Sequence, residues 1–419
     1  MKKTNLRKVC IVSPYSYPLF NPKCQSPFGG SEIRVSLIAK ELAKIGRFEV
    51  TMVVFDHGQP HTECREGVTL YSWTGKHNPS KVVPEDRASL HWLRFRCLNI
   101  LLITRTWIRR RLYRIGRIGP HAIESANVAI YDDVDADIYI MHGNSDLAAE
   151  LAVYCKQRGK KYVFLAGSDG DYHPGYKAHP EAMGIYGLPG YLLVYAIENA
   201  SVHIVQSKHQ AELLRQTYGR SSVVVKSPLE LGRTSPKETE PDTILWIGKS
   251  DWIKRPEIVL QLARQFPEYH FVVIINCSNR QIHARCIREA EALSNVTLLH
   301  YVPYSEVEGY FAKAKLLVNT SIFEGFPNTF LQAAKYEVPI VSYQVDPGEM
   351  ISKHECGLLC DGDFERLKEN VRLLMTTPSF YAARSANCLQ YIKTHHDKDK
   401  IIKEFEDVLV SVCQKPFFS

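Results

Sequence analysis

The 419-residue sequence lacks any apolar run long enough to cross a bilayer, and the apolar run near its start, residues 9–12, is too short for a signal peptide. Its eleven cysteines, from Cys10 to Cys413, include no Cys-x-x-Cys pair, which argues against a disulfide framework or a zinc ribbon. The histidines and cysteines near His57 and His354 are irregularly spaced, so we expect no metal site. These absences favour a cytoplasmic protein with reduced cysteines.

Acidic residues are absent from residues 88–123, which contain eight arginines. A helix across this stretch would place Leu112 and Ile115 on an apolar side and Arg110 on the opposite side. Such a helix suits an anionic membrane surface, so we expect a peripheral contact with the inner face of the cytoplasmic membrane through residues 90–118. The alternative is a helix packed on a sheet with its arginines in water. No recognised nucleic-acid-binding module accompanies the charge, so we expect no nucleic acid partner.

The composition, 45% hydrophobic and 23% charged, fits a globular chain of two or three domains. In the first half, short apolar runs alternate with amphipathic stretches, which predicts a parallel sheet with helices on both faces. The expected strands are Val9–Ser13, Val50–Phe55, Ile138–Met141, Tyr162–Leu165, Val202–Val205 and Val223–Val225, and the expected helices include Ser31–Ile45, Leu147–Arg158 and Lys208–Tyr218.

A polar segment with prolines, residues 232–242, interrupts this pattern and resembles an interdomain linker. We expect one domain over residues 1–231 and a second over 232–397, with a helix at 398–412 that returns to the first. The expected strands of the second domain are Thr243–Ile247, Phe271–Ile275, Val296–His300, Leu316–Asn319, Ile340–Ser342 and Gly357–Leu359. Ligands of open α/β sheets bind at the carboxyl ends of the strands, so we expect the site in a cleft there.

Three loops at expected strand ends carry candidate site residues. Gly29 and Gly30 precede an expected helix, and they either let a ligand approach the backbone or only make a tight turn. This turn matches neither the Gly-x-Gly-x-x-Gly motif nor a Walker loop. "GKSDWIKRPE" gathers Lys249 and Lys254, which either neutralise a diphosphate or form a solvated turn. "FEGFPN" presents Glu324, which either accepts hydrogen bonds from sugar hydroxyls or is a surface acid.

The helix that follows Glu324 is expected to continue to about Tyr336. Asn328 and Thr329 are suitable residues to cap its start. Helical spacing places Asn328 and Gln332 on one face, and the free N–H groups at a helix start suit a phosphate.

The order of these motifs resembles glycosyltransferase family 4, whose members are retaining enzymes of the GT-B fold with two Rossmann-like domains. The resemblance rests on the Gly-Gly loop, on Gly-Lys-x4-Lys, and on "SIFEGFPNTFLQAAKYEVPIVS" followed by "DPGEM". It is strongest over residues 242–361. It implies an α/β fold and the transfer of a sugar from a nucleotide sugar.

In that family an acid, seven residues and a second acid form the donor site. The resemblance implies that Glu324 contacts the donor sugar, that Lys249 and Lys254 bind the diphosphate, and that Gln332 stands at the ribose position. The donor-binding residues implied in this way are Gly248, Gly325, Phe326, Pro327, Asn328, Thr329 and Gln332, beside the catalytic residues Glu324, Lys254 and Lys249.

The chain departs from the family pattern at two positions. Gln332 replaces the second acid, which keeps a hydrogen-bond acceptor but loses the charge-assisted component. Ala166, in "VFLAGSDGDY", stands where many relatives have a histidine. We therefore expect His142, Asp169 or the nearby Asp171 to act on the acceptor side, together with Gly29 and Gly30.

The sequence thus predicts a metal-independent retaining glycosyltransferase that uses a nucleotide sugar and a glycan or lipid-linked acceptor in polysaccharide or glycoconjugate biosynthesis. No cofactor is expected. Two alternatives remain open: a sugar-nucleotide epimerase on the same fold, and a non-catalytic membrane-associated subunit with a degenerate donor site, which Gln332 and Ala166 suggest.

Overall fold

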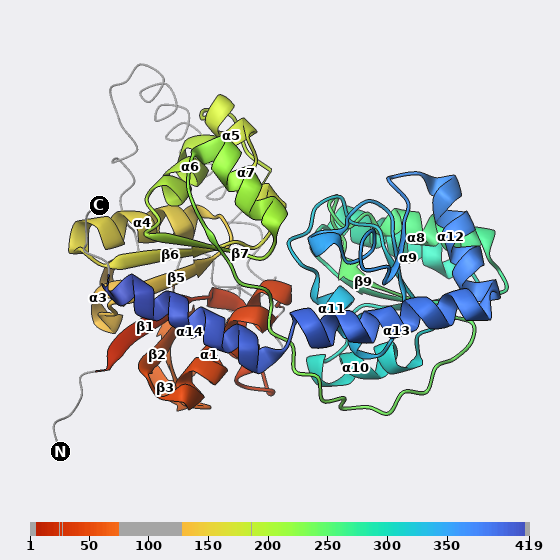
Figure 1. Ribbon diagram of the computed structural model, residues 1–419, viewed down its shortest axis with the longest axis horizontal. Coiled ribbons are helices and arrows are strands. Elements are labelled where there is room, and N and C mark those ends of the chain that lie inside the picture. Colours follow the sequence, from red (N-terminus) through yellow and green to blue (C-terminus); the bar gives the residue numbers. More distant parts are fainter. Residues whose placement is uncertain (1–5, 25, 27, 75–127, 186, 415–419) are drawn as a thin grey trace, which may run out of the picture. The chain divides into compact units, whose positions relative to one another are not determined.

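The computed structural model describes residues 6–24, 26, 28–74, 128–185 and 187–414 (Figure 1). The chain divides into two compact units. The first contains residues 1–205, 210–225 and 402–419, and the second contains residues 206–209 and 226–401. Each unit has helices around a mostly parallel sheet, which confirms the α/β class with two domains that the sequence predicts.

An eight-stranded sheet forms the centre of the first unit, in the order β3-β4-β2-β1-β5-β6-β7-β8. Neighbouring strands run parallel except β3 and β4, which are antiparallel. The strands are β1 (Arg7–Val12), β2 (Phe48–Phe55), β3 (Thr62–Arg65), β4 (Val68–Trp73), β5 (Ile138–His142), β6 (Lys161–Leu165), β7 (Val202–Val205) and β8 (Val223–Val224). Strands β3 and β4 were not predicted from the sequence. Strand β3 lies at the edge and is mostly exposed, so it lacks an apolar pattern.

The helices of this part of the chain include the three predicted ones, α1, α4 and α7. Local signals set their ends: Ser145 accepts a hydrogen bond from the N–H of Ala148 at the start of α4, and Gly159, with φ +62°, ends it in the left-handed conformation. The helices are α1 (Gly30–Ile45), α3 (Val128–Val134), α4 (Asp146–Arg158), α5 (Gly175–Ala178), α6 (Gly190–Glu198) and α7 (Lys208–Tyr218), with 3-10 turns η1 (Pro14–Leu19) and η5 (Asp169–Tyr172).

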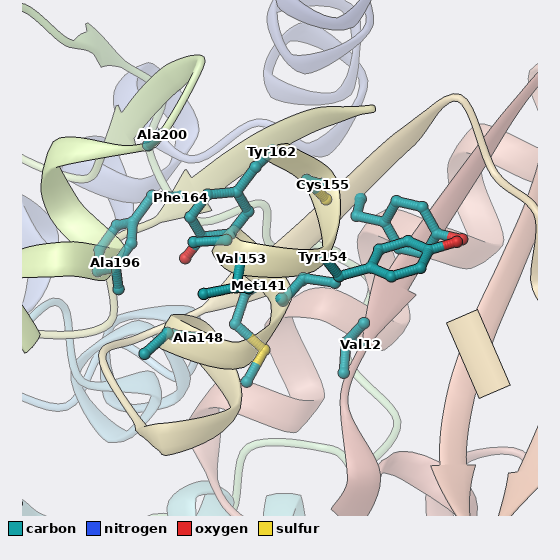
Figure 2. Packing of buried hydrophobic residues seen from close by; sticks show 14 of the residues in the cluster. Val12, Met141, Ala148, Val153, Tyr154, Cys155, Tyr162, Phe164, Ala196 and Ala200 are labelled. Carbon is teal, nitrogen blue, oxygen red and sulfur yellow. The ribbon is translucent and has the colours of Figure 1, made fainter. Parts of the chain in front are cut away.

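Aromatic residues fill much of the core of the first unit (Figure 2). Tyr162 of β6 and Tyr154 of α4 contribute buried rings to one apolar cluster, in which Tyr131 and Tyr139 also lie. Tyr139 donates a hydrogen bond to the carbonyl oxygen of Tyr131 at 2.6 Å, so its buried hydroxyl has a partner. This core fixes β5 and β6, whose carboxyl ends carry the expected acceptor-side residues.

The sheet of the second unit is entirely parallel, in the order β11-β10-β9-β12-β13-β14. Its strands are β9 (Thr243–Lys249), β10 (His270–Asn276), β11 (Val296–Leu299), β12 (Leu316–Asn319), β13 (Ile340–Ser342) and β14 (Gly357–Leu359). All six were predicted from apolar runs. Because β9 and β12 are parallel neighbours, the loops that follow them lie side by side at the carboxyl ends of the strands.

Successive side chains of β9 point to opposite faces of the sheet, and the core of this unit accordingly has two layers, one on each face. Leu245 packs with the layer that contains Phe330, and Trp246 packs with the layer that contains Val259. Both faces of the sheet are therefore covered, as a buried parallel sheet requires. The helices are α8 (Pro256–Gln265), α9 (Arg280–Glu291), α10 (Tyr304–Lys313), α11 (Asn328–Lys335), α12 (Phe364–Thr376) and α13 (Pro378–His395), with the 3-10 turn η6 (Pro347–Glu349).

The polar segment 232–242, interpreted from its composition as a linker, lies within the second unit along α10. Thr234 donates to Glu308 at 2.7 Å, and the N–H of Glu238 donates to the carbonyl oxygen of Ala312 at 3.0 Å. Its polar groups thus have partners on a helix. Composition alone could not distinguish such a surface strap from a free linker.

The last helix, α14 (Lys398–Gln414), buries the apolar stripe that the sequence predicts. Ile401, Phe405 and Leu409 are all buried, and the residues from Ile402 onward group with the first unit. Within that unit, Arg47 donates to Glu406 at 2.8 Å. The basic stretch 88–123 lies outside the described residues. Among the helices that the structure describes, none has an apolar length sufficient to cross a membrane.

Candidate functional site

Two loops at the carboxyl ends of β9 and β12 carry the predicted catalytic residues of the second unit. The first, residues 250–255, follows β9, which ends at Lys249, and the second, residues 320–327, follows β12. Three hydrogen bonds to backbone carbonyl oxygens join them: from the N–H of Ile322 to Ile253 at 2.9 Å, from the Thr320 hydroxyl to Lys254 at 2.5 Å, and from the Arg255 Nε to Thr320 at 2.9 Å. The two loops therefore form one continuous piece of structure.

Lys254 and Glu324 meet where these loops join. Lys254 Nζ donates a hydrogen bond to Glu324 Oε1, and the two side chains are 26% and 12% exposed, respectively. The pair is thus partly shielded but still accessible, which strengthens the attraction relative to a fully exposed pair. The structure brings together two residues that lie far apart in the sequence, as the predicted site requires.

An aspartate fixes the conformation of the first loop. Asp251 Oδ1 accepts hydrogen bonds from the N–H groups of Ile253 at 3.1 Å and Lys254 at 2.9 Å. At the next position Arg255 adopts φ +48°, in the left-handed region, and occupies the cap position before α8. This turn directs the lysine back toward Glu324.

Gly248 and Lys249 end strand β9. A Cβ atom on Gly248 would lie 2.7 Å from the ring of Trp246, which itself donates to the Thr320 hydroxyl at 2.9 Å. A glycine is therefore needed where β9 leaves the sheet. The side chain of Lys249 is exposed and forms no ion pair with any residue in the described part of the chain. It is a second cation at the same strand end.

The segment Gly325–Pro327 leads from Glu324 into α11. Gly325 and Pro327 are buried, and Phe326 packs against His396 with ring centroids 4.5 Å apart. Helix α11 begins at Asn328 with Pro327 in the cap position and no side-chain cap, so the prediction that Asn328 and Thr329 cap it is wrong. The fixed φ of proline already sets the helix entry. No acid lies in the first turn, so its positive end is not neutralised by a side chain of the helix itself.

Gln332 lies one turn into α11, four residues after Asn328. Only 9% of its surface is exposed. Its Oε1 is buried and has no hydrogen-bond partner in the described structure. An unpaired buried acceptor is costly, and a ligand hydroxyl that donated to it would remove that cost.

The expected acceptor-side residues lie in the first unit. Gly29 occupies the cap position of α1 and Gly30 is its first residue, and Glu32 accepts a hydrogen bond from the Gly29 N–H at 2.7 Å. That N–H therefore has a partner within the turn, as in a helix capping box. Asp169 begins the turn η5, which follows β6.

His142 ends β5, and its Nε2 is buried without a partner among the described residues. Burial and the nearby positive charge of Arg34 lower the pKa of His142 to about 3. A Cβ atom on Gly167 would lie 3.0 Å from the ring, so the backbone after Ala166 passes close to it. His142 is therefore a neutral imidazole at neutral pH.

Two further residues bond to the backbone of this region: Asp171, which was among the acceptor-side residues expected from the sequence, and Arg34, which was not. Asp171 accepts hydrogen bonds from the N–H groups of Asn144 at 3.0 Å, Gly167 at 2.6 Å and Ser168 at 3.0 Å, so it holds together the loops after β5 and β6. Buried Arg34 donates to the carbonyl oxygens of Ala166 and of residue 225, both at 3.1 Å, and burial lowers its pKa to about 9.

No cluster of three or more histidine, cysteine or carboxylate side chains that could hold a metal ion occurs within the described ranges. The cation that contacts Glu324 is the ammonium group of Lys254.

Residues 241–377 match the family described as "Glycosyl transferases group 1". The chain is similar to glycosyltransferase 1 domain-containing protein 1 of Xenopus tropicalis, with 26% identity over 152 residues, or 34% of this chain. That alignment spans 44% of the relative, so the chain matches less than half of the length of this curated protein.

Solved structures extend the likeness of the fold to nearly the whole chain. The sucrose-phosphate synthase of Thermosynechococcus elongatus has a TM-score of 0.69 and 15% identity, over 97% of this chain and 99% of that one. The α,α-trehalose-phosphate synthase (UDP-forming) of Burkholderia xenovorans has a TM-score of 0.65 and 12% identity, over 96% and 99%. These comparisons confirm the resemblance that the motifs indicate. Residues 241–377 match the group 1 glycosyl transferases, and the chain has the fold of the GT-B glycosyltransferases.

Proposed function

We propose that this protein is a retaining glycosyltransferase that transfers a sugar from a nucleotide sugar to a glycan or lipid-linked acceptor in polysaccharide or glycoconjugate biosynthesis. The contact between Lys254 and Glu324, at the junction of two loops in the segment that matches the group 1 family, carries the proposal. It joins a cation suited to a diphosphate with a carboxylate suited to sugar hydroxyls.

Lys249 and Lys254 stabilise the leaving diphosphate. As the bond between the sugar and the diphosphate breaks, the electron pair and the negative charge pass to the diphosphate oxygen. Two ammonium groups held near that oxygen stabilise this charge more in the transition state than in the ground state. The exposed Lys249 is available to a ligand, and Lys254 is held in place by Glu324 before the donor binds.

Glu324 orients the donor sugar. Its carboxylate has capacity for further hydrogen bonds after it accepts one from Lys254, so it can accept a sugar hydroxyl at the same time. The start of α11, with Asn328 and Thr329, lies four residues further along the chain and offers its positive end to the phosphate groups. Gln332, with its unpaired Oε1, accepts from a ribose hydroxyl.

We propose that the reaction needs no metal ion, because lysine side chains supply the charge that Mg²⁺ supplies in many phosphate sites. The trehalose-phosphate synthase with this fold is UDP-forming by its title, so uridine diphosphate is the first nucleotide to test. His142 and Asp169 serve the acceptor, and residues 90–118, outside the described structure, provide the proposed contact with the cytoplasmic face of the membrane.

A panel of nucleotide sugars in a thermal-shift screen, followed by transfer assays with the best donor and with chelator present, tests this function. Transfer to added acceptor is expected to persist in chelator. Isomerised donor without acceptor would instead indicate an epimerase, and no nucleotide binding would indicate a non-catalytic subunit. Lys313→Ala is a suitable control, because Lys313 forms an exposed ion pair with Glu240 at the opposite, amino end of β12.

A further inference from the structure

Trp252 lies in the loop between Lys249 and Lys254 and is 50% exposed. The other tryptophans in the described part of the chain, Trp73 and Trp246, are buried. An indole ring is among the largest apolar surfaces that a side chain can leave in water, and exposed aromatics beside polar groups are typical of ligand sites. Its position within the proposed diphosphate loop makes it a candidate contact with the donor.

The backbone on either side of Trp252 is fixed. Asp251 accepts hydrogen bonds from the two N–H groups that follow Trp252, at residues 253 and 254. The carbonyl oxygen of Ile253 accepts from the N–H of Ile322 at 2.9 Å. Trp252 is therefore exposed on a rigid turn, so little conformational entropy is lost when a ligand packs against it.

The indole packs edge-on against Phe323, with ring centroids 6.4 Å apart and an interplanar angle of 79°. Phe323 stands between Ile322, which is bonded to the first loop, and Glu324, which is bonded to Lys254. Phe323 is thus flanked in the sequence by two residues whose hydrogen bonds join the loops. One of these residues is Glu324, the proposed ligand of the donor sugar.

We propose that Trp252, supported by Phe323, forms an aromatic platform for the ring of the donor sugar. This inference rests on the proposed function and adds a specificity-determining contact to it. The C–H groups on one face of a pyranose are apolar and weakly positive, and they suit the negative face of an aromatic ring. The hydroxyls at the ring edge then remain free to reach Glu324. A sugar with axial hydroxyls on that face would lose the contact.

Binding of uridine diphosphate and of the best UDP-sugar to wild type and Trp252→Ala, measured by calorimetry, tests the platform. We expect Trp252→Ala to bind the UDP-sugar about two- to tenfold more weakly and uridine diphosphate with unchanged affinity. Trp252→Phe should retain most of the affinity. Titration of wild type with UDP-sugar should change the tryptophan fluorescence, and this change should be absent in Trp252→Phe.

Leu373→Ala, at an exposed apolar residue on α12, is the control for loss of apolar surface in the same unit. Unchanged affinity of Trp252→Ala for the UDP-sugar would overturn the platform while leaving the proposed function in place. If Trp252→Ala bound uridine diphosphate and the UDP-sugar more weakly by the same factor, the platform would also be overturned, because the indole would then contact the nucleotide. If the uridine ligands do not bind, the same comparison is made with the nucleotide sugar that does, and absence of binding of every nucleoside diphosphate and nucleotide sugar by wild type would overturn both proposals. If Trp252→Ala unfolds, Trp252→Leu gives the same comparison.

Discussion

Lys254, in the loop after β9, donates a hydrogen bond to Glu324, in the loop after β12. The two residues lie far apart in the sequence, yet parallel pairing of β9 with β12 brings both loops together at the carboxyl ends of these strands. The contact is therefore a consequence of the strand order. It places the cation and the carboxylate of the proposed donor site within one unit.

Lys254→Ala and Glu324→Ala should each lower the turnover number for sugar transfer by roughly 10²-fold, because each removes a charge aligned with the reacting groups. The double variant should lose little more than either single variant, since the two side chains act as a unit. Transfer assays on the three variants and on Lys313→Ala measure this. Additive losses would show that the residues act independently.

Replacement of Gln332 by glutamate should tighten nucleotide binding about fivefold, because a ribose hydroxyl would donate to a charged acceptor instead of a neutral one. Burial raises the pKa of a carboxyl group at this position, so the gain should be present at higher pH and disappear as the pH falls. Calorimetric titrations at two pH values measure both effects, with Gln332→Ala as the loss-of-acceptor control. An affinity that is the same in all three proteins would place the ribose elsewhere.

Gly248→Ala should lower the free energy of unfolding by about 1–3 kcal/mol, because the new Cβ would lie 2.7 Å from the Trp246 ring. Gly232→Ala is the matched control, since nothing lies within 4 Å of a Cβ at that exposed position. Denaturant unfolding of both variants gives the comparison. Equal stability of the two variants would mean that β9 can shift at its carboxyl end without cost.

His142 should make the stability of the protein depend on pH. The pKa of His142 is about 3 in the folded protein, and that of an unfolded histidine is about 6.5, so between these values the unfolded chain binds a proton that the folded chain does not. Stability should thus rise with pH from about 3 to 6.5, and His142→Asn should make that rise shallower. His203, whose pKa burial also lowers to about 3, contributes in both proteins.

Unfolding curves at several pH values, with the exposed His179→Asn as control, test this effect. An unchanged pH dependence in His142→Asn would show that the imidazole is solvated and titrates normally.

The strands of both sheets could be predicted because parallel strands buried on both faces are short apolar runs. The exposed edge strand β3 has no such run. The cap of α11 was predicted wrongly, since polar Asn328 and Thr329 resemble capping residues while Pro327 occupies the cap position. The strap at 232–242 resembled a linker because its partners on α10 are distant in sequence.

Candidate site residues could be predicted where they belong to a sequence motif, and they were missed where their role depends on contacts with residues distant in the sequence. Glu324, Lys249 and Lys254 belong to spaced motifs. Arg34 bonds to backbone carbonyl groups at the ends of β6 and β8, and backbone carbonyls leave no trace in a sequence. Trp252 is a single aromatic in a charged loop, where neither periodicity nor a motif distinguishes it from a core residue.

Calorimetric titration of wild type and Lys254→Ala with uridine diphosphate, and with other nucleoside diphosphates where that one does not bind, shows whether Lys254 binds the diphosphate of a donor. We predict binding by wild type and at least about tenfold weaker binding by Lys254→Ala, which corresponds to the loss of a charge-assisted contact of roughly 1.4 kcal/mol. Absence of binding of every nucleoside diphosphate by wild type, or equal affinity in the two proteins, would contradict it.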